Sequence, residues 1–239
     1  NNVEVVIFKS SDKAVNPTNV MGTTKLMGER LMTAANSCKR KDGPIFVSTR
    51  FGNVLGSSGS VVPIFRNQIF SGGPVTLTDK DMTRFVMHVK EAVELVLDSV
   101  TEAKGGEVFV TKMPVMKIEN LAIAMIEELC SEEMEIVEIG SKPGEKLYEE
   151  LMSDEETRRT IELDKFFSVM PAFKGLYGDI KYNYSKIVSE IVKDPYVSEK
   201  RVFLTVEEVK QFLSDGNLLY RSGDNAENIK YYSGNKENK

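Results

Sequence analysis

The sequence predicts an α/β fold built on a parallel sheet. Two short apolar runs rich in β-branched residues, Val3–Phe8 and Ile45–Val47, are typical of buried strands. Between them, residues 20–36 carry apolar side chains at helical spacing. A strand, a helix and a strand joined by short links form a βαβ unit, and the crossover rule makes its two strands parallel.

Polar and small residues follow each of these two strands. Ser10, Ser11, Asp12 and Lys13 come after the first strand, and the glycine- and serine-rich segment 50–60 comes after the second. Ligands bind at the carboxyl ends of the strands in such sheets. Glycine lets a backbone approach a ligand closely, and exposed N–H groups suit an anionic oxygen. The pattern therefore predicts a ligand site at this edge of the sheet, although a Gly/Ser segment is more often only a loop.

The rest of the chain continues the alternation of helices and strands. Apolar periodicity predicts helices at residues 61–70, 90–99, 118–129, 147–152 and 205–213, the last with a capping box formed by Thr205 and Glu208. Short apolar runs predict strands at residues 75–78, 108–110 and 136–137. The aromatic-rich residues 166–184 favour a flap or an oligomer contact. We therefore expect domains at residues 1–70 and 71–215, and a polar, disordered tail at 216–239.

Composition and charge exclude several classes of protein. With 31 basic and 36 acidic residues and no basic block, the chain does not resemble a nucleic-acid-binding protein. No apolar run approaches the ~20 residues that span a bilayer. Cys38 and Cys130 lie far apart without CxxC spacing, which favours a reducing compartment, the cytoplasm, and no structural metal. The single histidine, His88, lies between apolar residues, so a structural role is the more frequent one.

Five segments within about residues 3–152 carry a resemblance to a known family: DKAVNPTNVMG, RFGNVLGSSGSVVPIF, DMTRF, GGEVFV and KPGEKLYEEL. In this order they resemble the extended short-chain dehydrogenase/reductases, and within them the UDP-N-acetylglucosamine 4,6-dehydratases of polysaccharide biosynthesis. The resemblance implies a Rossmann-like sheet and a smaller substrate-binding domain. We expect the N-terminal half of that sheet, with its dinucleotide fingerprint, to be missing here. NAD or NADP, a UDP-sugar and a homo-oligomer are also implied.

The resemblance assigns the elimination of water to Asp12 as acid and Lys13 as base. A lysine acts as a base only when its pKa falls well below the free value of ~10.4. Met21 stands where most relatives carry the tyrosine that takes a hydroxyl proton, and a thioether has no dissociable proton. Lys25, on the same helix face, matches the lysine that binds the nicotinamide ribose. The sugar C4 hydroxyl proton then leaves through Ser11, Asp12, Lys25 or a water, and the sequence leaves these alternatives open.

Further residues match ligand contacts of the relatives. Cofactor contacts are implied for Ser10, Lys25 and Asn53. Substrate contacts are implied for Asn53, Ser58, Gly59, Ser60, Val61, Arg84, Lys142 and Glu145. Arg84 ends a predicted turn at residues 79–84. It corresponds to a diphosphate contact, although an arginine among apolar residues also pairs frequently with a carboxylate. Lys142 replaces the arginine of an RPGEK motif, which keeps the charge and loses the bidentate fork.

The resulting hypothesis is a nucleotide-sugar 4,6-dehydratase. Hydride leaves C4 for the cofactor, water is lost across C5 and C6, and the hydride returns to C6. Two alternatives stay open. A UDP-sugar 4-epimerase needs only the hydride step and usually the tyrosine absent at Met21. A non-catalytic remnant or oligomerisation module would explain both Met21 and the absent fingerprint, and we expect the chain alone to bind NAD(P) poorly.

Overall fold

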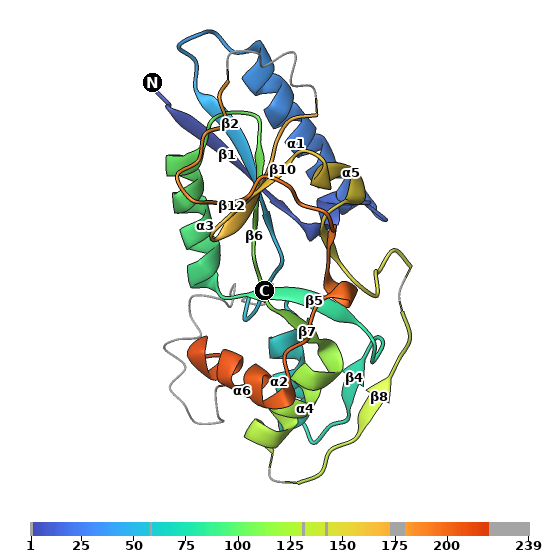
Figure 1. Cartoon of the computed structure of the whole chain (residues 1–239). Helices are drawn as coiled ribbons and strands as arrows, with labels where there is room; N and C mark the ends of the chain where they lie inside the picture. Colours follow the sequence, from blue (N-terminus) through green and yellow to red (C-terminus); the bar gives the residue numbers. More distant parts are fainter. Residues whose placement is uncertain (1, 58, 131, 142, 173–179, 220–239) are drawn as a thin grey trace, which may run out of the picture.

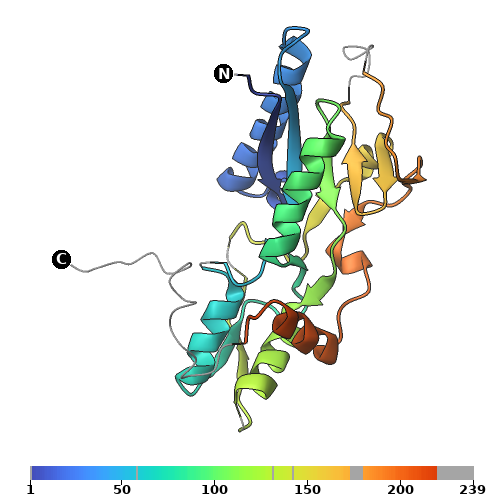
Figure 2. The same ribbon diagram turned by 90° about the vertical axis from the view of Figure 1, so that its left-hand side faces the viewer.

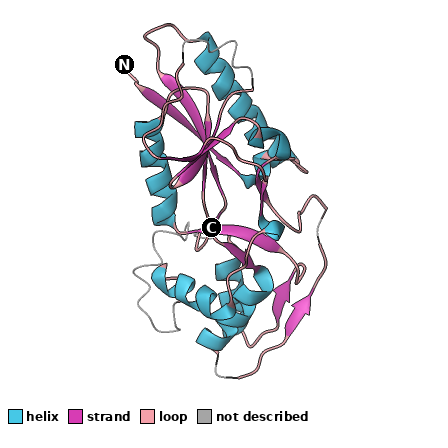
Figure 3. Cartoon of the chain, viewed as in Figure 1, coloured by secondary structure: helices cyan, strands magenta, loops and turns pink. Residues whose placement is uncertain are grey.

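The protein, seen here in a computed structural model, has a large sheet flanked by helices and a smaller region of helices and short strands beside one end of it (Figure 1 and Figure 3). The structure describes residues 2–57, 59–130, 132–141, 143–172 and 180–219. The large sheet has the strand order β1-β2-β6-β11-β10-β12. Its strands are β1 (Val5–Ser11), β2 (Ile45–Phe51), β6 (Val108–Thr111), β10 (Thr160–Leu163), β11 (Phe166–Val169) and β12 (Ile187–Ser189).

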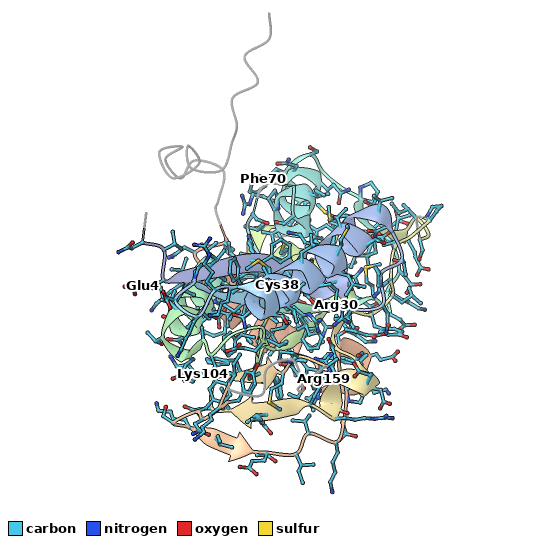
Figure 4. All side chains as sticks on the ribbon, turned by 90° about the horizontal axis from the view of Figure 1, so that it is seen from above. Glu4, Arg30, Cys38, Phe70, Lys104 and Arg159 are labelled. Carbon is cyan, nitrogen blue, oxygen red and sulfur yellow. The ribbon has the colours of Figure 1, made fainter. Side chains whose placement is uncertain are left out.

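The sheet is parallel in one half and antiparallel in the other. β1, β2 and β6 run parallel, whereas β11, β10 and β12 pair antiparallel with their neighbours. Helices α1 (Val20–Cys38) and α3 (Val89–Glu102) cover opposite faces, as Figure 1 and Figure 2 show. Arg30 and Cys38 mark the course of α1 when the molecule is seen from above (Figure 4). The predicted βαβ unit and its parallel, Rossmann-like sheet are therefore confirmed.

The smaller region has its own apolar core. Helices α2 (Val61–Phe70), α4 (Ile118–Leu129) and α6 (Val206–Asp215) pack together with side chains from short strands. One three-stranded sheet contains β3 (Asn53–Val54), β5 (Thr83–Met87) and β7 (Val115–Lys117). A second pairs β4 (Val75–Leu77) with β8 (Ile136–Glu138). The predicted helices at 61–70, 90–99, 118–129 and 205–213 are confirmed, as is the capping box of Thr205 and Glu208.

Helix α2 packs with elements that follow it in the chain. Val62, Phe65 and Ile69 are buried in the same core as α4 and α6. β6, β10, β11 and β12, by contrast, return to the large sheet from beyond residue 100. The expected domain boundary at residue 70 stays a prediction, and residues 220–239 of the expected tail lie outside the described residues.

Three local expectations were wrong, each because a long-range pairing decides the structure. Residues 147–152 do not form a helix: β9 (Glu150–Met152) pairs with β13 (Tyr196–Val197). Arg84 lies within strand β5 and not in a turn, because β5 pairs with β7. The segment 166–184 begins with β11, a fully buried strand held between β6 and β10, and residues 173–179 of the segment lie outside the described residues. Strand pairing determines the structure of all three segments, and the periodicity of a single sequence does not reveal this pairing. The remaining short elements are η1 (Asp12–Ala14), α5 (Asp154–Thr157) and η3 (Ser198–Lys200).

Candidate active site

The end of β1 passes directly into η1, which carries the first pair of functional side chains. Ser11 caps η1 by accepting a hydrogen bond from the Lys13 N–H at 3.3 Å. Asp12 is fully buried, and its Oδ1 accepts bonds from the Lys13 N–H at 2.8 Å and from Lys13 Nζ at 2.9 Å. The Lys13 side chain stays 37% exposed. The two predicted elimination residues thus form an ion pair with one member buried and the other open to solvent.

Helix α1 begins against this pair because of Gly22. A Cβ on Gly22 would lie 2.3 Å from the Lys13 carbonyl oxygen, so any other residue would push the helix away. Met21 next to it is 60% exposed. One turn later, Lys25 Nζ donates to the Lys9 carbonyl of β1 at 2.9 Å, which ties the helix to the sheet.

The loop of residues 143–149 is held against this edge from two sides. Arg84 of β5 donates from Nη2 to the Lys146 carbonyl at 2.7 Å and from Nη1 to the Leu147 carbonyl at 3.1 Å. Lys146 Nζ donates to the Val15 carbonyl, just after η1, at 2.7 Å. Thr18 Oγ1 donates to the Gly144 carbonyl at 2.9 Å. The loop therefore bridges the smaller region and the end of β1.

These elements enclose a pocket of about 390 Å³. Its lining residues are Lys13, Thr18, Asn19, Asn53, Arg84, Pro143, Gly144, Glu145, Lys146 and Glu149. Four of them, Lys13, Asn53, Arg84 and Glu145, carry sequence-predicted roles and come from four separate segments. The Asn53 Oδ1 atom is buried and has no hydrogen-bond partner among the described residues. An acceptor left unpaired in a pocket wall is available to a ligand donor.

Other predicted residues lie elsewhere. Gly59, Ser60 and Val61 are at the start of α2, where the Ser60 side chain makes no capping bond, and they do not line this pocket. The pocket lining also does not include Ser10, Ser11, Asp12, Met21 and Lys25. Within the described ranges, the buried Ser10 Oγ atom finds no hydrogen-bond partner. Ser58 and Lys142 lie outside the described residues.

Glu149 is a pocket residue that sequence reasoning missed. Its side chain is 6% exposed, and its Oε1 lies 3.8 Å from Arg84 Nε. Burial raises the pKa of Glu149, and the negative charge of Asp12 raises it further. Burial also lowers the pKa of Arg84, an effect that Glu149 and Asp12 oppose. The available signal was the pair of consecutive glutamates, Glu149 and Glu150, in the otherwise apolar segment Leu147–Met152, and the helix prediction concealed it.

The site therefore combines two buried carboxyl groups with three cations, Lys13, Arg84 and Lys146. Such a set of groups can bind an anionic ligand. Its ionisable side chains can also exchange protons with a bound ligand. In the part of the chain that the structure describes, every helix is too short or insufficiently apolar to cross a bilayer.

Several known proteins are similar to this chain in sequence. The chain is 47% identical over 223 residues to a protein of Methanocaldococcus jannaschii named uncharacterized membrane protein MJ1061, covering 91% of this chain and 63% of that protein. A UDP-N-acetylglucosamine 4,6-dehydratase (inverting) of Campylobacter jejuni is 39% identical, over 73% of this chain and 51% of its own length. A UDP-glucose 4-epimerase of Rickettsia rickettsii is 37% identical, over 89% and 62%. The chain thus spans between half and two thirds of these relatives.

A solved structure has the same fold. Pen from Bacillus thuringiensis superposes with a TM-score of 0.81 at 39% identity, covering 92% of this chain and 64% of that one. The family described as polysaccharide biosynthesis protein matches residues 1–171, from β1 past the end of β11. This chain therefore belongs to the polysaccharide biosynthesis protein family, whose relatives named above include nucleotide-sugar dehydratases and epimerases.

Proposed function

We propose that this chain forms part of a nucleotide-sugar 4,6-dehydratase that converts UDP-N-acetylglucosamine to a UDP-4-keto-6-deoxy sugar. The observation that carries the proposal is the Asp12–Lys13 ion pair at the end of β1, with Lys13 on the pocket wall. Elimination of water needs an acid and a base in addition to the hydride step. A buried carboxyl group beside a solvent-open lysine supplies that combination, in the roles that the family resemblance implies.

The pocket suits a sugar nucleotide. Its volume of about 390 Å³ lies within the usual range for small-molecule sites. Lys146 and Arg84 bring positive charge to it, which favours a diphosphate. Arg84 already donates from both Nη atoms to backbone carbonyls. It therefore attracts a ligand through its charge and not through a bidentate hydrogen-bonded contact. Glu145 and Asn53 add polar groups for the sugar or the uridine.

The residues beside the pocket fit NAD or NADP, which when bound accepts a hydride from sugar C4 and returns it at C6. The Lys25 ammonium has three donors and spends one on the Lys9 carbonyl, so it can bind ribose hydroxyl groups with the others. Ser10 Oγ, buried and unpaired within the described part of the chain, is a second polar contact. Together with Asn53 these residues would hold the cofactor.

Met21 bears on the choice between dehydration and epimerisation. It is exposed and cannot accept a hydroxyl proton as a base, so that proton leaves through a neighbouring group or a water. A UDP-sugar 4-epimerase is the second candidate, favoured by the 37% identity to the Rickettsia epimerase. Epimerisation needs only the hydride step, and it leaves the Asp12–Lys13 pair without a task.

The test uses the protein that contains this chain, with UDP-N-acetylglucosamine and NAD or NADP. We expect a 4-keto-6-deoxy sugar, detected by mass and NMR spectroscopy. Asp12→Asn and Lys13→Ala should each lower turnover by about 10²- to 10⁴-fold, the usual contribution of an acid or base. Lys80→Ala, an exposed lysine away from the pocket, is the matched control. A 4-epimer alone would establish the epimerase, and bound cofactor without turnover would establish the remnant.

A further inference from the structure

The Glu149 carboxyl group is almost fully buried in the pocket wall and has an incomplete set of partners. Its side chain is 6% exposed, and its Oε2 atom makes no hydrogen bond within the ranges that the structure describes. Its Oε1 atom faces Arg84 Nε at 3.8 Å, which is beyond hydrogen-bond distance. A buried polar oxygen without a partner is destabilising, so such an atom in a pocket wall indicates a ligand that supplies the donor.

Two unpaired oxygens from different segments belong to the same pocket. Glu149 and Asn53 are both lining residues, and each has a buried oxygen without a hydrogen-bond partner among the described residues. Asp12 Oδ2 is equally buried and unpaired, but Asp12 does not line the pocket. An amide oxygen and a carboxylate oxygen are both hydrogen-bond acceptors. The pocket wall therefore suits a ligand that carries several O–H or N–H donors, such as a sugar.

The backbone of Glu149 is fixed from both sides by Ser198. The Glu149 N–H donates to Ser198 Oγ at 2.9 Å, and the Ser198 N–H donates to the Glu149 carbonyl at 2.9 Å. Ser198 Oγ also bonds Thr83 Oγ1 at 2.8 Å. All of these residues are buried. A carboxyl group on so constrained a backbone meets a ligand in one defined position.

Glu149 lies beside the pair proposed to carry out the elimination. The strand that it precedes, β9, packs against η1, which contains Asp12 and Lys13. The side-chain amide of Asn16, just after η1, donates to the Glu150 carboxylate and joins the same two segments. Burial raises the pKa of Glu149, the charge of Asp12 raises it further, and the charge of Lys13 lowers it. A ligand whose reacting carbon atoms meet Lys13 therefore brings its sugar ring toward Glu149.

Charge separates the part of the ligand that Glu149 can bind from the part that it cannot. An ionised carboxylate repels a diphosphate, whereas Arg84 and Lys146 attract it from the same pocket lining. A hydroxyl group both donates and accepts, so it can bond the Glu149 carboxyl group in either protonation state. The hydroxyl and amide groups of a sugar are therefore suitable partners for this side chain.

We propose that Glu149 is a specificity-determining residue of this pocket, whose unpaired carboxyl oxygen forms a hydrogen bond with a hydroxyl or amide group of the substrate sugar. This inference rests on the proposed dehydratase function. It leaves the roles of Asp12 and Lys13 unchanged, because Glu149 transfers no proton. A ligand without the matching group leaves the buried oxygen unpaired, and such a site discriminates strongly against that ligand.

The first test compares the binding of UDP-N-acetylglucosamine with that of UDP, which lacks the sugar. Calorimetric titration uses the protein that contains this chain, with no cofactor added, so that the sugar is not oxidised. Glu149→Met keeps the length of the side chain and removes its oxygens, so Kd for UDP-N-acetylglucosamine should rise about 10- to 100-fold. Kd for UDP should stay the same or fall, because no negative charge is left to repel the diphosphate. Glu199→Met, at an exposed glutamate that does not line the pocket, should change neither Kd.

A second variant, Glu149→Gln, keeps the fold testable if the methionine variant does not fold. It retains the shape and one carbonyl oxygen but loses the charge, and should raise Kd for UDP-N-acetylglucosamine about 3- to 10-fold. A merely structural role, or a contact with the uridine, would weaken the binding of both ligands together. An unchanged ratio of the two Kd values in these variants therefore overturns the inference.

The last test is turnover of UDP-N-acetylglucosamine with NAD or NADP in the same protein. Glu149→Met should raise KM by a factor similar to that for Kd, with a smaller change in kcat and the same product. A loss that falls mainly on kcat overturns the binding role. Wild-type protein that makes no 4-keto-6-deoxy sugar overturns the proposed function, whatever the ratio of the two Kd values. Wild-type protein that binds neither ligand overturns both.

Discussion

Two buried charged clusters lie close together in this protein and differ in how completely their groups are paired. The Arg50 cluster consists of Glu29, Arg50 and Glu156. Arg50 Nε and Nη2 donate to Glu29 at 2.8 and 2.6 Å, and Nη1 and Nη2 donate to Glu156 at 2.8 Å each. A fifth bond joins Arg50 Nη1 to the Leu151 carbonyl at 3.0 Å. The five N–H donors of the guanidinium group are thereby all used.

The pocket cluster consists of Asp12, Lys13, Arg84 and Glu149. Its arginine donates to backbone carbonyls, and its two carboxyl groups each keep one oxygen that is unpaired among the residues described. The strand segment around β9 connects the two clusters, because Glu149 and Leu151 are only two residues apart. A saturated cluster can fix the fold but cannot bind a ligand. A cluster beside a pocket that has unpaired oxygens can still form hydrogen bonds to a ligand.

The largest expected effect is on the saturated cluster. Arg50→Met leaves two carboxylates buried without their cation and should destabilise the fold by about 3–5 kcal/mol. The measurement is urea unfolding followed by circular dichroism. Lys112→Met removes a half-exposed ion pair with Glu162, 2.7 Å long, and should cost less than about 1 kcal/mol. Equal losses in the two variants would show that the Arg50 cluster is no more than an ordinary surface pair.

A smaller effect concerns acid stability. Burial by itself would raise the pKa of Glu156, but the charge and hydrogen bonds of Arg50 outweigh it and lower the pKa to about 2. The unfolded value is ~4.3, so the group stabilises the fold above that pH and ceases to do so as the pH falls through 2, on the order of 3 kcal/mol. Unfolding free energies measured from pH 5 to pH 2 should fall less steeply in Glu156→Gln. Parallel slopes would contradict the low pKa.

Much of the pocket was accessible to prediction, because short-range signals carry it. Asp12 and Lys13 follow an apolar strand directly, and Asn53 follows the next strand along the chain. Strand ends, caps and helical periodicity are encoded within a few neighbouring residues, which is why the helices and the parallel pair were found. The pocket itself brings Lys13, Asn53, Arg84 and Glu145 together as one lining. Their roles toward cofactor and substrate stay predictions.

The Arg50 cluster and Glu149 were missed because their partners are distant in sequence. Arg50 looked like the start of a polar loop, yet β2 continues to Phe51 and its partner Glu156 lies 106 residues away. Glu149 gains its setting from β9, which pairs with β13 more than forty residues later, and from Ser198. Neither pairing leaves a local pattern, since β9 is only three residues long. Whether a charged residue in so short a strand is buried depends on tertiary packing and not on the neighbouring sequence.

The smallest predicted effect tests what holds the pocket cluster in place. Ser198→Ala removes the hydroxyl group that accepts the Glu149 N–H and bonds Thr83 Oγ1, leaving the Glu149 N–H and the Thr83 hydroxyl group buried without this partner. We expect a loss of about 1–2 kcal/mol in unfolding free energy. Ser189→Ala removes a hydroxyl that bonds only the nearby Ile191 backbone and should change stability by less than about 0.5 kcal/mol. Unchanged stability in Ser198→Ala would contradict the role of this hydroxyl group in holding the Glu149 backbone.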